Sequence, residues 1–252
     1  MAAPEQPADS DRPTAVVTGA ASGIGRALAQ LLAEDGYDLC LADIDADGLE
    51  RVASAVGAET ADATDVADAA QMDALAARSG PIDLLCLNAG VLSPSMGPPW
   101  EVSPSEWDRV MGVNLGGVVN GLRSFVPGML ARPEPSRILI TASLAGALTW
   151  PAGGAYAASK HAALAVAEQA ALGLADSHVS VTVMCPALVR TAMSEEGDDP
   201  VEVAQRGLRA ATDGQFAVID DEWADALLTR ARTLSGGGRP ELPLPVVEPG
   251  PG

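Results

Sequence analysis

The stretch Thr18-Gly19-Ala20-Ala21-Ser22-Gly23-Ile24-Gly25 decides the fold of this chain of 252 residues. It follows a short β-branched run, Thr14–Thr18, and opens a segment with apolar residues at helical spacing, Gly23–Asp35. Three glycines at a strand-to-helix junction permit a tight turn and a close backbone approach, while the helix N-terminus offers free N–H groups. The turn is therefore typical of a dinucleotide pyrophosphate site, although its spacing, G-x-x-x-G-x-G, differs from the commoner G-x-G-x-x-G.

Strand-like and helix-like segments alternate along the chain, beginning with the strand before this turn. The expected strands are Thr14–Thr18, Asp38–Ala42, Ala58–Ala61, Ile82–Leu87, Arg137–Ala142, His178–Met184 and Gln215–Ile219. The expected helices are Gly23–Asp35, Ala46–Val56, Val66–Arg78, Pro104–Ala131, Gly154–Ala175 and Asp221–Leu234. Because the strand-like runs are apolar without alternation, they predict a parallel sheet covered on both faces. The fold class is a single α/β domain with a doubly wound, Rossmann-type sheet.

The two ends of the chain differ in composition from the part between them. Residues 1–12 are rich in Pro, Ala, Asp and Glu and predict a disordered arm; residues 236–252 predict an extended Pro/Gly-rich tail. The catalytic domain is expected to span residues 13–235. Met1–Pro13 has neither a basic start nor an apolar run, so we expect no secretory signal. With no run of about 20 apolar residues, a cytoplasmic location is predicted.

Charge and cysteine usage exclude several classes of partner. The chain has 15 Lys and Arg against 34 Asp and Glu, a net charge of −19, which repels phosphate backbones and anionic lipids. We therefore expect neither a nucleic-acid nor a membrane partner. The three cysteines, Cys40, Cys86 and Cys185, lie in or beside apolar runs. An odd count without metal-type spacing predicts reduced core thiols, no disulfide and no metal site.

Asp43 ends the second strand, 18 residues after Gly25. A carboxylate there can accept hydrogen bonds from the adenosine ribose hydroxyls and would repel a 2′-phosphate. Neither Ser22 nor Ile44 supplies a positive charge to offset that repulsion. The position thus favours NAD over NADP, the alternative being a solvated loop aspartate in an acidic chain.

Tyr156 and Lys160 stand four residues apart at the start of an expected helix, so the phenol and the ammonium lie on one helical face. Lys160 is the only lysine and Tyr156 one of two tyrosines. A neighbouring cation is expected to lower the pKa of the phenol and prepare it for proton exchange with an alcohol. Ser143, just past a strand end, could hydrogen-bond the substrate oxygen. His161 is expected to be a bystander on another face.

Together these residues resemble the short-chain dehydrogenase/reductase family in its single-domain form, over Thr14–Met193. The resemblance implies catalytic roles for Asn114, Ser143, Tyr156 and Lys160. In such enzymes the Asn, at a helix distortion, helps to bind a water joined to the lysine, and neighbouring glycines here make a distortion plausible. The resemblance implies NAD-binding roles for Gly19, Ser22, Gly23, Ile24, Gly25, Asp43, Asp65, Asn88, Ala89, Gly90, Tyr156, Lys160, Pro186, Val189 and Thr191.

Three departures from the family pattern stand out. Leu87 replaces the first Asn of the usual Asn-Asn-Ala-Gly, a position expected to tolerate change, and Ala187 replaces the Gly of the usual Pro-Gly. The C-terminal part lacks the family's frequent Tyr-Ile-Thr-Gly and Asp-Gly-Gly segments. This weakens any inference about tetramers, so the expectation is a homodimer or a homotetramer. The stretch Lys160–Leu174, mostly Ala and Leu, favours pairing through that helix.

Substrate contacts are expected from Val91–Met96, Leu144–Trp150 and Ala187–Met193. The residues chosen for substrate binding are Ser143, Leu144, Trp150, Tyr156 and Leu188. Arg190 alone is charged among these segments, so an uncharged, largely apolar secondary alcohol or ketone is predicted. The chain is expected to be an NAD-dependent alcohol dehydrogenase or ketoreductase. The alternatives are a non-catalytic NAD-binding regulator, and an epimerase or dehydratase of the same superfamily.

Overall fold

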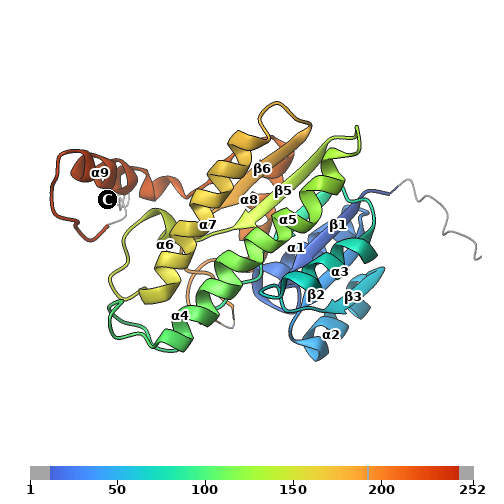
Figure 1. Ribbon diagram of the computed structural model, residues 1–252, viewed down its shortest axis with the longest axis horizontal. Helices are drawn as coiled ribbons and strands as arrows, with labels where there is room; N and C mark the ends of the chain where they lie inside the picture. Colours follow the sequence, from blue (N-terminus) through green and yellow to red (C-terminus); the bar gives the residue numbers. More distant parts are fainter. Residues whose placement is uncertain (1–11, 192, 244–252) are drawn as a thin grey trace, which may run out of the picture.

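A parallel sheet runs through the middle of the computed structural model, which describes residues 12–191 and 193–243 (Figure 1). Within that part of the chain the sheet has seven strands in the order β3-β2-β1-β4-β5-β6-β7. They are β1 (Thr14–Thr18), β2 (Asp38–Asp43), β3 (Thr60–Ala63), β4 (Leu84–Leu87), β5 (Ser136–Thr141), β6 (Val179–Met184) and β7 (Ala217–Val218). The predicted doubly wound α/β fold is confirmed.

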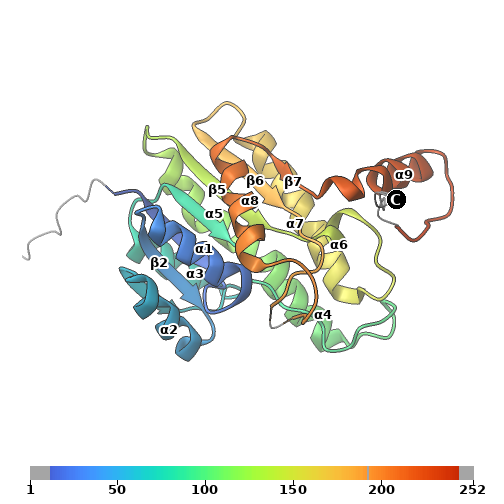
Figure 2. The same cartoon turned by 180° about the vertical axis from the view of Figure 1, so that it is seen from behind.

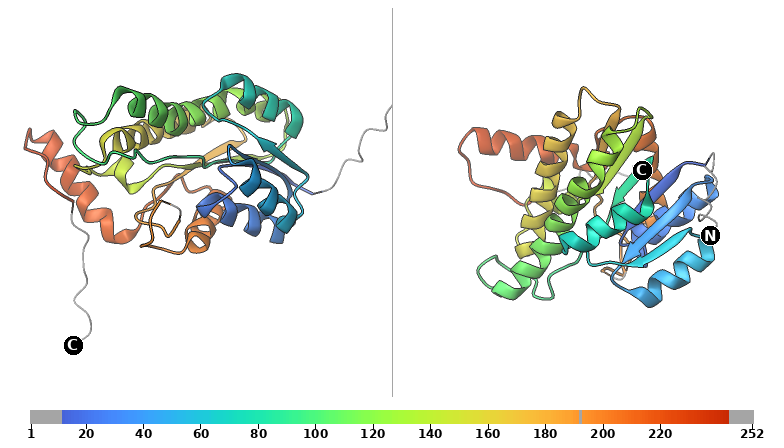
Figure 3. Two further views of the ribbon diagram at one scale, coloured as in Figure 1. Left: turned by 90° about the horizontal axis from the view of Figure 1, so that it is seen from below. Right: turned by 45° about the vertical axis from the view of Figure 1, so that its right-hand side comes forward.

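Helices cover both faces of the sheet. One face is packed by α1 (Gly23–Glu34), α2 (Ala46–Val56) and α8 (Pro200–Thr212). The other is packed by α3 (Ala69–Ser79), α5 (Gly117–Leu130) and α7 (Gly154–Gly173). Figure 3, left, shows the two layers above and below the sheet seen on edge. Both cores consist mainly of Val, Leu, Ile, Ala and Met side chains, as the small number of aromatic residues requires.

The strand order reverses direction between β1 and β4, which are neighbours in the sheet although two helix–strand units separate them in sequence. Such a switch point leaves a crevice at the carboxyl ends of the strands, because the two connections leave in opposite directions. The glycine-rich turn follows β1 and Asn88 follows β4. Both motifs singled out from the sequence therefore border that crevice.

The long helix predicted over Pro104–Ala131 is divided by a distortion. α4 (Pro104–Met111) is followed by a π-helical turn, η1 (Gly112–Gly116), and then by α5. A π-turn inserts one residue into the hydrogen-bond ladder and is frequent at functional sites. The distortion expected around Asn114 is therefore present, and Asn114 is buried within it.

Other boundaries differ from the sequence predictions. β3 begins at Thr60, two residues later than predicted, and β7 has two residues where five were expected. α3 begins at Ala69 because the Asp68 carboxylate accepts the N–H groups of Ala70 and Gln71 as an N-cap. Two helices were missed altogether, the four-residue α6 (Leu144–Ala147) and α8.

The C-terminal part leaves the sheet. After β7, a 3₁₀ turn, η2 (Asp221–Trp223), leads into α9 (Ala224–Ser235), which projects beyond the rest of the molecule (Figures 1 and 2). The proposed arm and tail lie largely outside the described residues. Arg12, the first described residue, forms an ion pair with Asp38 at 3.1 Å. No helix in the described part of the chain is long and apolar enough to cross a membrane.

Candidate active site

The glycine-rich turn is shaped by close backbone contacts. Gly19 has a φ of 68°, and a Cβ atom at this position would lie 2.8 Å from the Cα of Ala89. A side chain at Gly25 would strike the carbonyl oxygen of Gly19. The helix α1 begins at Gly23, with Ser22 as its exposed N-cap residue. Only glycine fits these positions, and the free N–H groups of α1 remain directed at the crevice.

Asp43 lies beside this turn, as predicted. One carboxylate oxygen accepts the N–H of Ala21 at 2.9 Å, and the other accepts the N–H of Asp45 at 2.9 Å. The neighbouring side chain of Ile44 is 73% exposed. Asp43 therefore shapes the turn in addition to presenting a negative charge at the end of β2. Asp65 follows β3 and accepts the N–H of Ala67 at 2.9 Å.

Asn88 joins three neighbouring strands. Its Nδ2 donates to the carbonyl of Thr18 at 3.1 Å, and its Oδ1 accepts the hydroxyl of Thr141 at 3.0 Å. The Thr18 hydroxyl in turn accepts the N–H groups of Asn88 and Ala89. The Asn88 side chain thus holds β1, β4 and β5 in register at the crevice. These hydrogen bonds of Thr18 and Thr141 were not predicted, because their partners lie about 50 to 70 residues away in sequence.

The loop that follows β6 approaches the glycine-rich turn from the opposite side. A Cβ at Gly23 would lie 3.0 Å from a methyl carbon of Thr191. Val189 is buried and forms a bridge with Asp198. Pro186 begins this loop directly after β6 and Cys185. The structure therefore brings Val189 and Thr191 to the turn, as the cofactor assignment requires.

Tyr156 lies on the first turn of α7, opposite the end of β5. Its phenol lies close enough to Ser143 for that residue to affect the pKa of the phenol. Ser143 also caps α6 by accepting the N–H of Ala145 at 3.1 Å. Lys160 lies with its ammonium 5.8 Å from the Tyr156 ring centroid. Its Nζ donates to the carbonyl of Thr141 at 2.9 Å. Three of the four predicted catalytic side chains are therefore together.

The electrostatics of this group differ from the sequence prediction. Burial raises the pKa of Tyr156 above its ordinary value, and the hydrogen bond with Ser143 opposes that rise. The expected lowering of the Tyr156 pKa by Lys160 was therefore wrong, because removing the phenol from water penalises the phenolate more. Burial also lowers the pKa of Lys160 from 10.5 to about 8.

Asn114 is held from two sides. Its amide exchanges hydrogen bonds with the backbone of Val91, at 2.7 and 3.0 Å, and its Nδ2 donates to Ser159 Oγ at 2.9 Å. The Ser159 hydroxyl donates to the carbonyl of Tyr156 at 2.7 Å. A Cβ at Gly90 would lie 3.2 Å from Lys160 Nζ and 3.4 Å from Asn114 Oδ1. Asn114 is therefore the fourth member of the group. Ser159 was missed, although it directly precedes the lysine.

Of the other reactive side chains, Cys185 lies beside the group, close enough to interact with Ser143 and Lys160. A ring nitrogen of His161 is 2.9 Å from the carbonyl oxygen of Ala157 on its own helix, which fits the expected bystander role. Burial raises the pKa of Cys86 to about 12 and that of Cys185 to about 11, so both thiols stay protonated. Among residues 12–191 and 193–243, no group of three His, Cys, Asp or Glu side chains is placed to hold a metal ion.

The predicted substrate residues differ in exposure. Trp150 stands edge-on to Tyr156, with ring centroids 6.1 Å apart, and is 40% exposed. Leu188 is 58% exposed and Leu144 is half-buried. The Arg190 guanidinium donates to the carbonyl of Gly197 at 2.8 Å, which directs it along its own loop. Trp150 thus offers apolar surface beside Tyr156, and Leu188 offers an exposed apolar side chain on the loop after β6.

The crevice fits a dinucleotide in its chemistry. The N-terminus of α1 offers N–H groups to phosphate oxygens, and the turn excludes side chains that would block the approach. Asp43 supplies a carboxylate suited to ribose hydroxyls, and the loops after β4 and β6 form opposite walls.

A family model described as short chain dehydrogenase matches residues 13–201. This chain belongs to the short-chain dehydrogenase/reductase family. The match covers the glycine-rich turn and all four predicted catalytic residues of this family member.

Relatives of this short-chain dehydrogenase include proteins of stated activity. A 1-deoxy-11-beta-hydroxypentalenate dehydrogenase of Streptomyces avermitilis is 40% identical over 225 residues, which are 85% of this chain and 79% of that protein. An uncharacterized NAD-dependent oxidoreductase of Mycobacterium tuberculosis is 35% identical over 202 residues, 72% of this chain and 73% of that protein. A short-chain dehydrogenase/reductase of Burkholderia phymatum, crystallised with NAD, is 32% identical with a TM-score of 0.86, covering 94% of this chain and 99% of that one.

Proposed function

We propose that this oxidoreductase interconverts a secondary alcohol and a ketone with NAD as the hydride carrier. The observation that carries the proposal is the placing of Tyr156 and Ser143, which lie close enough for Ser143 to lower the pKa of the phenol, beside the buried ammonium of Lys160 and next to a glycine-rich turn at the switch point. A proton donor and a hydroxyl that can both reach one substrate oxygen are what carbonyl reduction needs.

Each catalytic side chain has a distinct task in this proposal. In the reducing direction Tyr156, which burial keeps protonated near neutral pH, would donate its Oη proton to the substrate oxygen. Ser143 would hold the same oxygen through its hydroxyl. Lys160 would stabilise the phenolate that remains, and Asn114 would hold the wall beside the lysine. NAD, when bound, would supply or accept the hydride.

Asp43 supports NAD rather than NADP as the cofactor. Its carboxylate ends β2 next to the glycine-rich turn, and Asp45 follows two residues later. Two carboxylates at that point would repel a 2′-phosphate, while ribose hydroxyls can donate to them. The NAD-bound relative from Burkholderia phymatum and the NAD-dependent one from Mycobacterium tuberculosis favour the same choice.

The substrate class in this proposal is an uncharged, largely apolar alcohol or ketone of terpenoid-like shape. Trp150 presents a partly exposed apolar ring beside Tyr156, and Leu188 and Met193 are exposed apolar side chains of the segment predicted to contact substrate. Leu148, also considered from the sequence, is buried at 2% exposure and is not part of this surface. The hydroxypentalenate dehydrogenases of three Streptomyces species, 40 to 42% identical, support oxidation of a hydroxyl group and do not by themselves favour an uncharged substrate.

The protein is further proposed to form a homodimer through α5 and α7. Val119 and Leu130 on α5 and Leu172 on α7 are exposed by 42, 44 and 79%. Small residues such as Ala165 on the same helix would let a partner helix approach closely.

The experiment that tests the activity follows NADH absorbance with a panel of neutral cyclic alcohols and their ketones. Reversible NADH formation from an alcohol is the expected result. NADH binding without turnover of any compound would favour the regulator. Conversion of a sugar nucleotide without net change in NADH would favour the epimerase.

A further inference from the structure

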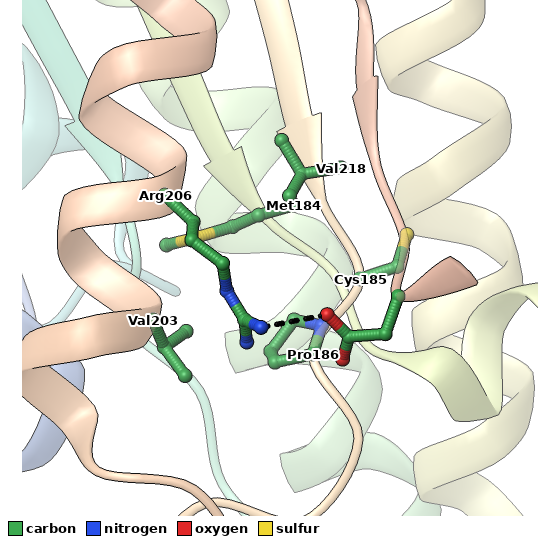
Figure 4. A pocket seen from close by; sticks show the side chains of 7 residues that line it. Met184, Cys185, Pro186, Val203, Arg206 and Val218 are labelled. Atoms are coloured by element: carbon green, nitrogen blue, oxygen red, sulfur yellow. Dashed lines mark ion pairs between the residues drawn. The ribbon is translucent and has the colours of Figure 1, made fainter. Parts of the chain in front are cut away.

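Three segments of the chain meet at one side chain, Arg206 of α8. Its Nη2 lies 2.9 Å from Asp198 Oδ2, and its Nη1 lies 2.8 Å from Asp220 Oδ1. Asp198 belongs to the loop after β6, and Asp220 follows β7 at the start of the C-terminal projection. Figure 4 shows the Arg206 guanidinium extending from α8 past Val203 toward Pro186, with its ion pair dashed.

Asp198 is in direct contact with the segment that carries Val189 and Thr191, both assigned to NAD binding. Its backbone N–H donates to the carbonyl of Leu188 at 2.8 Å, and its carbonyl accepts the N–H of Arg190 at 2.9 Å. These two bonds bracket Val189, one of the residues assigned to the cofactor. The side chain that holds Asp198 therefore also determines where Val189 lies.

The helix that carries Arg206 is fixed to the glycine-rich turn. Val203 and Ala204 of α8 are buried in the same core cluster as Ala27 and Leu28 of α1. Val189 belongs to that cluster as well. Because α1 begins at the turn, Arg206 connects the loop after β6 to the element that would hold the pyrophosphate.

Arg206 also offsets an acidic neighbourhood. Burial raises the pKa of Asp220, Arg206 opposes the rise, and the carboxylates of Asp198, Glu222 and Asp221 add to it. Without the guanidinium, Asp198 and Asp220 would repel each other beside Pro186. The loop after β6 would then be pushed away from α8.

We propose that Arg206 is a positioning residue for the cofactor. By bridging Asp198 and Asp220 it holds Val189 and Thr191 against the glycine-rich turn, so that the loop after β6 is in its binding geometry before the cofactor arrives. The inference rests on the proposed use of NAD. It adds a residue on a helix that carries none of the assigned catalytic or cofactor residues.

The test measures NADH binding directly, by the fluorescence of the bound cofactor, beside steady-state kinetics. For Arg206→Met we expect the Kd of NADH and the KM of NAD to rise about tenfold, which matches the loss of two partly exposed ion pairs. We expect kcat to stay within about threefold, since Tyr156, Ser143 and Lys160 are not touched. Arg206→Lys should recover part of the affinity, because an ammonium can satisfy one of the two carboxylates.

Two further variants separate positioning from general stability. Arg123→Met removes an Arg–Asp pair of similar length, 2.9 Å to Asp73, between α5 and α3, and should leave NADH binding unchanged at a similar cost in Tm. Asp198→Asn keeps the shape of the side chain and should weaken NADH binding as Arg206→Met does. Combining Asp198→Asn with Arg206→Met should add little further loss, because the Arg206–Asp198 ion pair is already absent from each single variant.

The outcomes are distinguishable from those of the proposed function. If wild-type protein does not bind NADH, the proposed function fails and the role of Arg206 with it. If wild-type protein binds NADH and both Arg206→Met and Asp198→Asn bind it within about twofold of wild type, only the positioning role is overturned. A fall in kcat with unchanged Kd would likewise overturn it.

Discussion

The buried ammonium of Lys160 donates a hydrogen bond to the carbonyl oxygen of Thr141 at 2.9 Å, beneath the loop that carries Gly90. The contact fixes the lysine at the end of β5, where Ser143 follows two residues later. One hydrogen bond compensates only part of the cost of removing an ammonium from water. The pKa of Lys160 is lowered because the cost of burying the ammonium exceeds what this hydrogen bond returns.

The first prediction is a pH-dependent stability difference between wild type and Lys160→Met. The pKa of Lys160 falls from 10.5 in the unfolded chain to about 8 in the folded one. Between those values the unfolded chain binds the proton that the folded chain has lost, so the free energy of unfolding of wild type rises with pH. The full effect is about 3 kcal/mol. Lys160→Met has nothing to titrate there.

We therefore expect the stability of Lys160→Met relative to wild type to be greatest near neutral pH and to decline toward about pH 10. Urea denaturation at a series of pH values measures it. Tyr156 is present in both proteins, so its own titration cancels in the difference. A stability difference that does not vary with pH would show that the pKa of Lys160 is not lowered in the folded protein.

The second prediction concerns Tyr156→Phe. Losing the phenol should lower kcat by about 100-fold to 10,000-fold, because the proton then has no positioned donor. NADH binding should stay nearly intact, since the phenol's described partner is Ser143. The matched control is Tyr37→Phe, which removes a hydroxyl that accepts a partly buried hydrogen bond from Arg137 at 3.3 Å, away from the catalytic residues. Substantial turnover by Tyr156→Phe would refute the proton-donor role.

The third prediction concerns cofactor choice. We expect kcat/KM to favour NAD over NADP by at least about 100-fold, from lost ribose hydrogen bonds and added charge repulsion. Asp43→Ala combined with Ile44→Arg should shift the preference toward NADP. Total efficiency should fall, because Asp43 also accepts the N–H of Ala21 in the turn. Ile44→Arg alone, which keeps that bond, is the control. Equal efficiency of wild type with both cofactors would exclude Asp43 as the selector.

The fourth prediction concerns assembly. Light scattering at micromolar concentration should give at least a dimer mass. Ala165→Glu places a charge on the exposed side of α7 and should shift the mass toward the monomer. Ala70→Glu makes the same change on the exposed surface of α3 and should leave the mass unchanged. A monomeric wild type would contradict the proposed α5 and α7 interface.

Features set by neighbouring residues could be predicted from the sequence, and features set by packing could not. The glycine-rich turn and the Tyr156–Lys160 pair are local, because one turn or one helical repeat contains all their members. The contact of Ser159 with Asn114 spans 45 residues and exists only because η1 packs against α7. The sign of the Tyr156 pKa shift was wrong for a related reason, since burial depends on the surrounding fold.

The α8 helix was not predicted, although its sequence carries local helix signals. Its Asp199-Pro200 start is a recognisable helix signal, and buried Val203, Ala204 and Gly207 follow at helical spacing. The motifs that carry the family resemblance end near Met193, before this helix begins, so α8 was not predicted. Arg206 was lost with the helix.

The last prediction concerns the substrate. Trp150 supplies apolar surface beside Tyr156, while Arg190, the charged residue of the predicted substrate segments, is paired with Asp199 at 3.3 Å. A carboxylate substrate is bound best by a guanidinium that points into the pocket, and Arg190 is held by Asp199 instead. In a matched series of cyclic ketones that differ only by one added carboxylate, we therefore expect the neutral ketones to have the higher kcat/KM. The name hydroxypentalenate denotes a carboxylate, so the acid members of the series are the decisive ones. Arg190→Met should leave the neutral ketones unaffected; if the acids are the better substrates and Arg190→Met abolishes their advantage, the substrate is an anion and the apolar assignment is wrong.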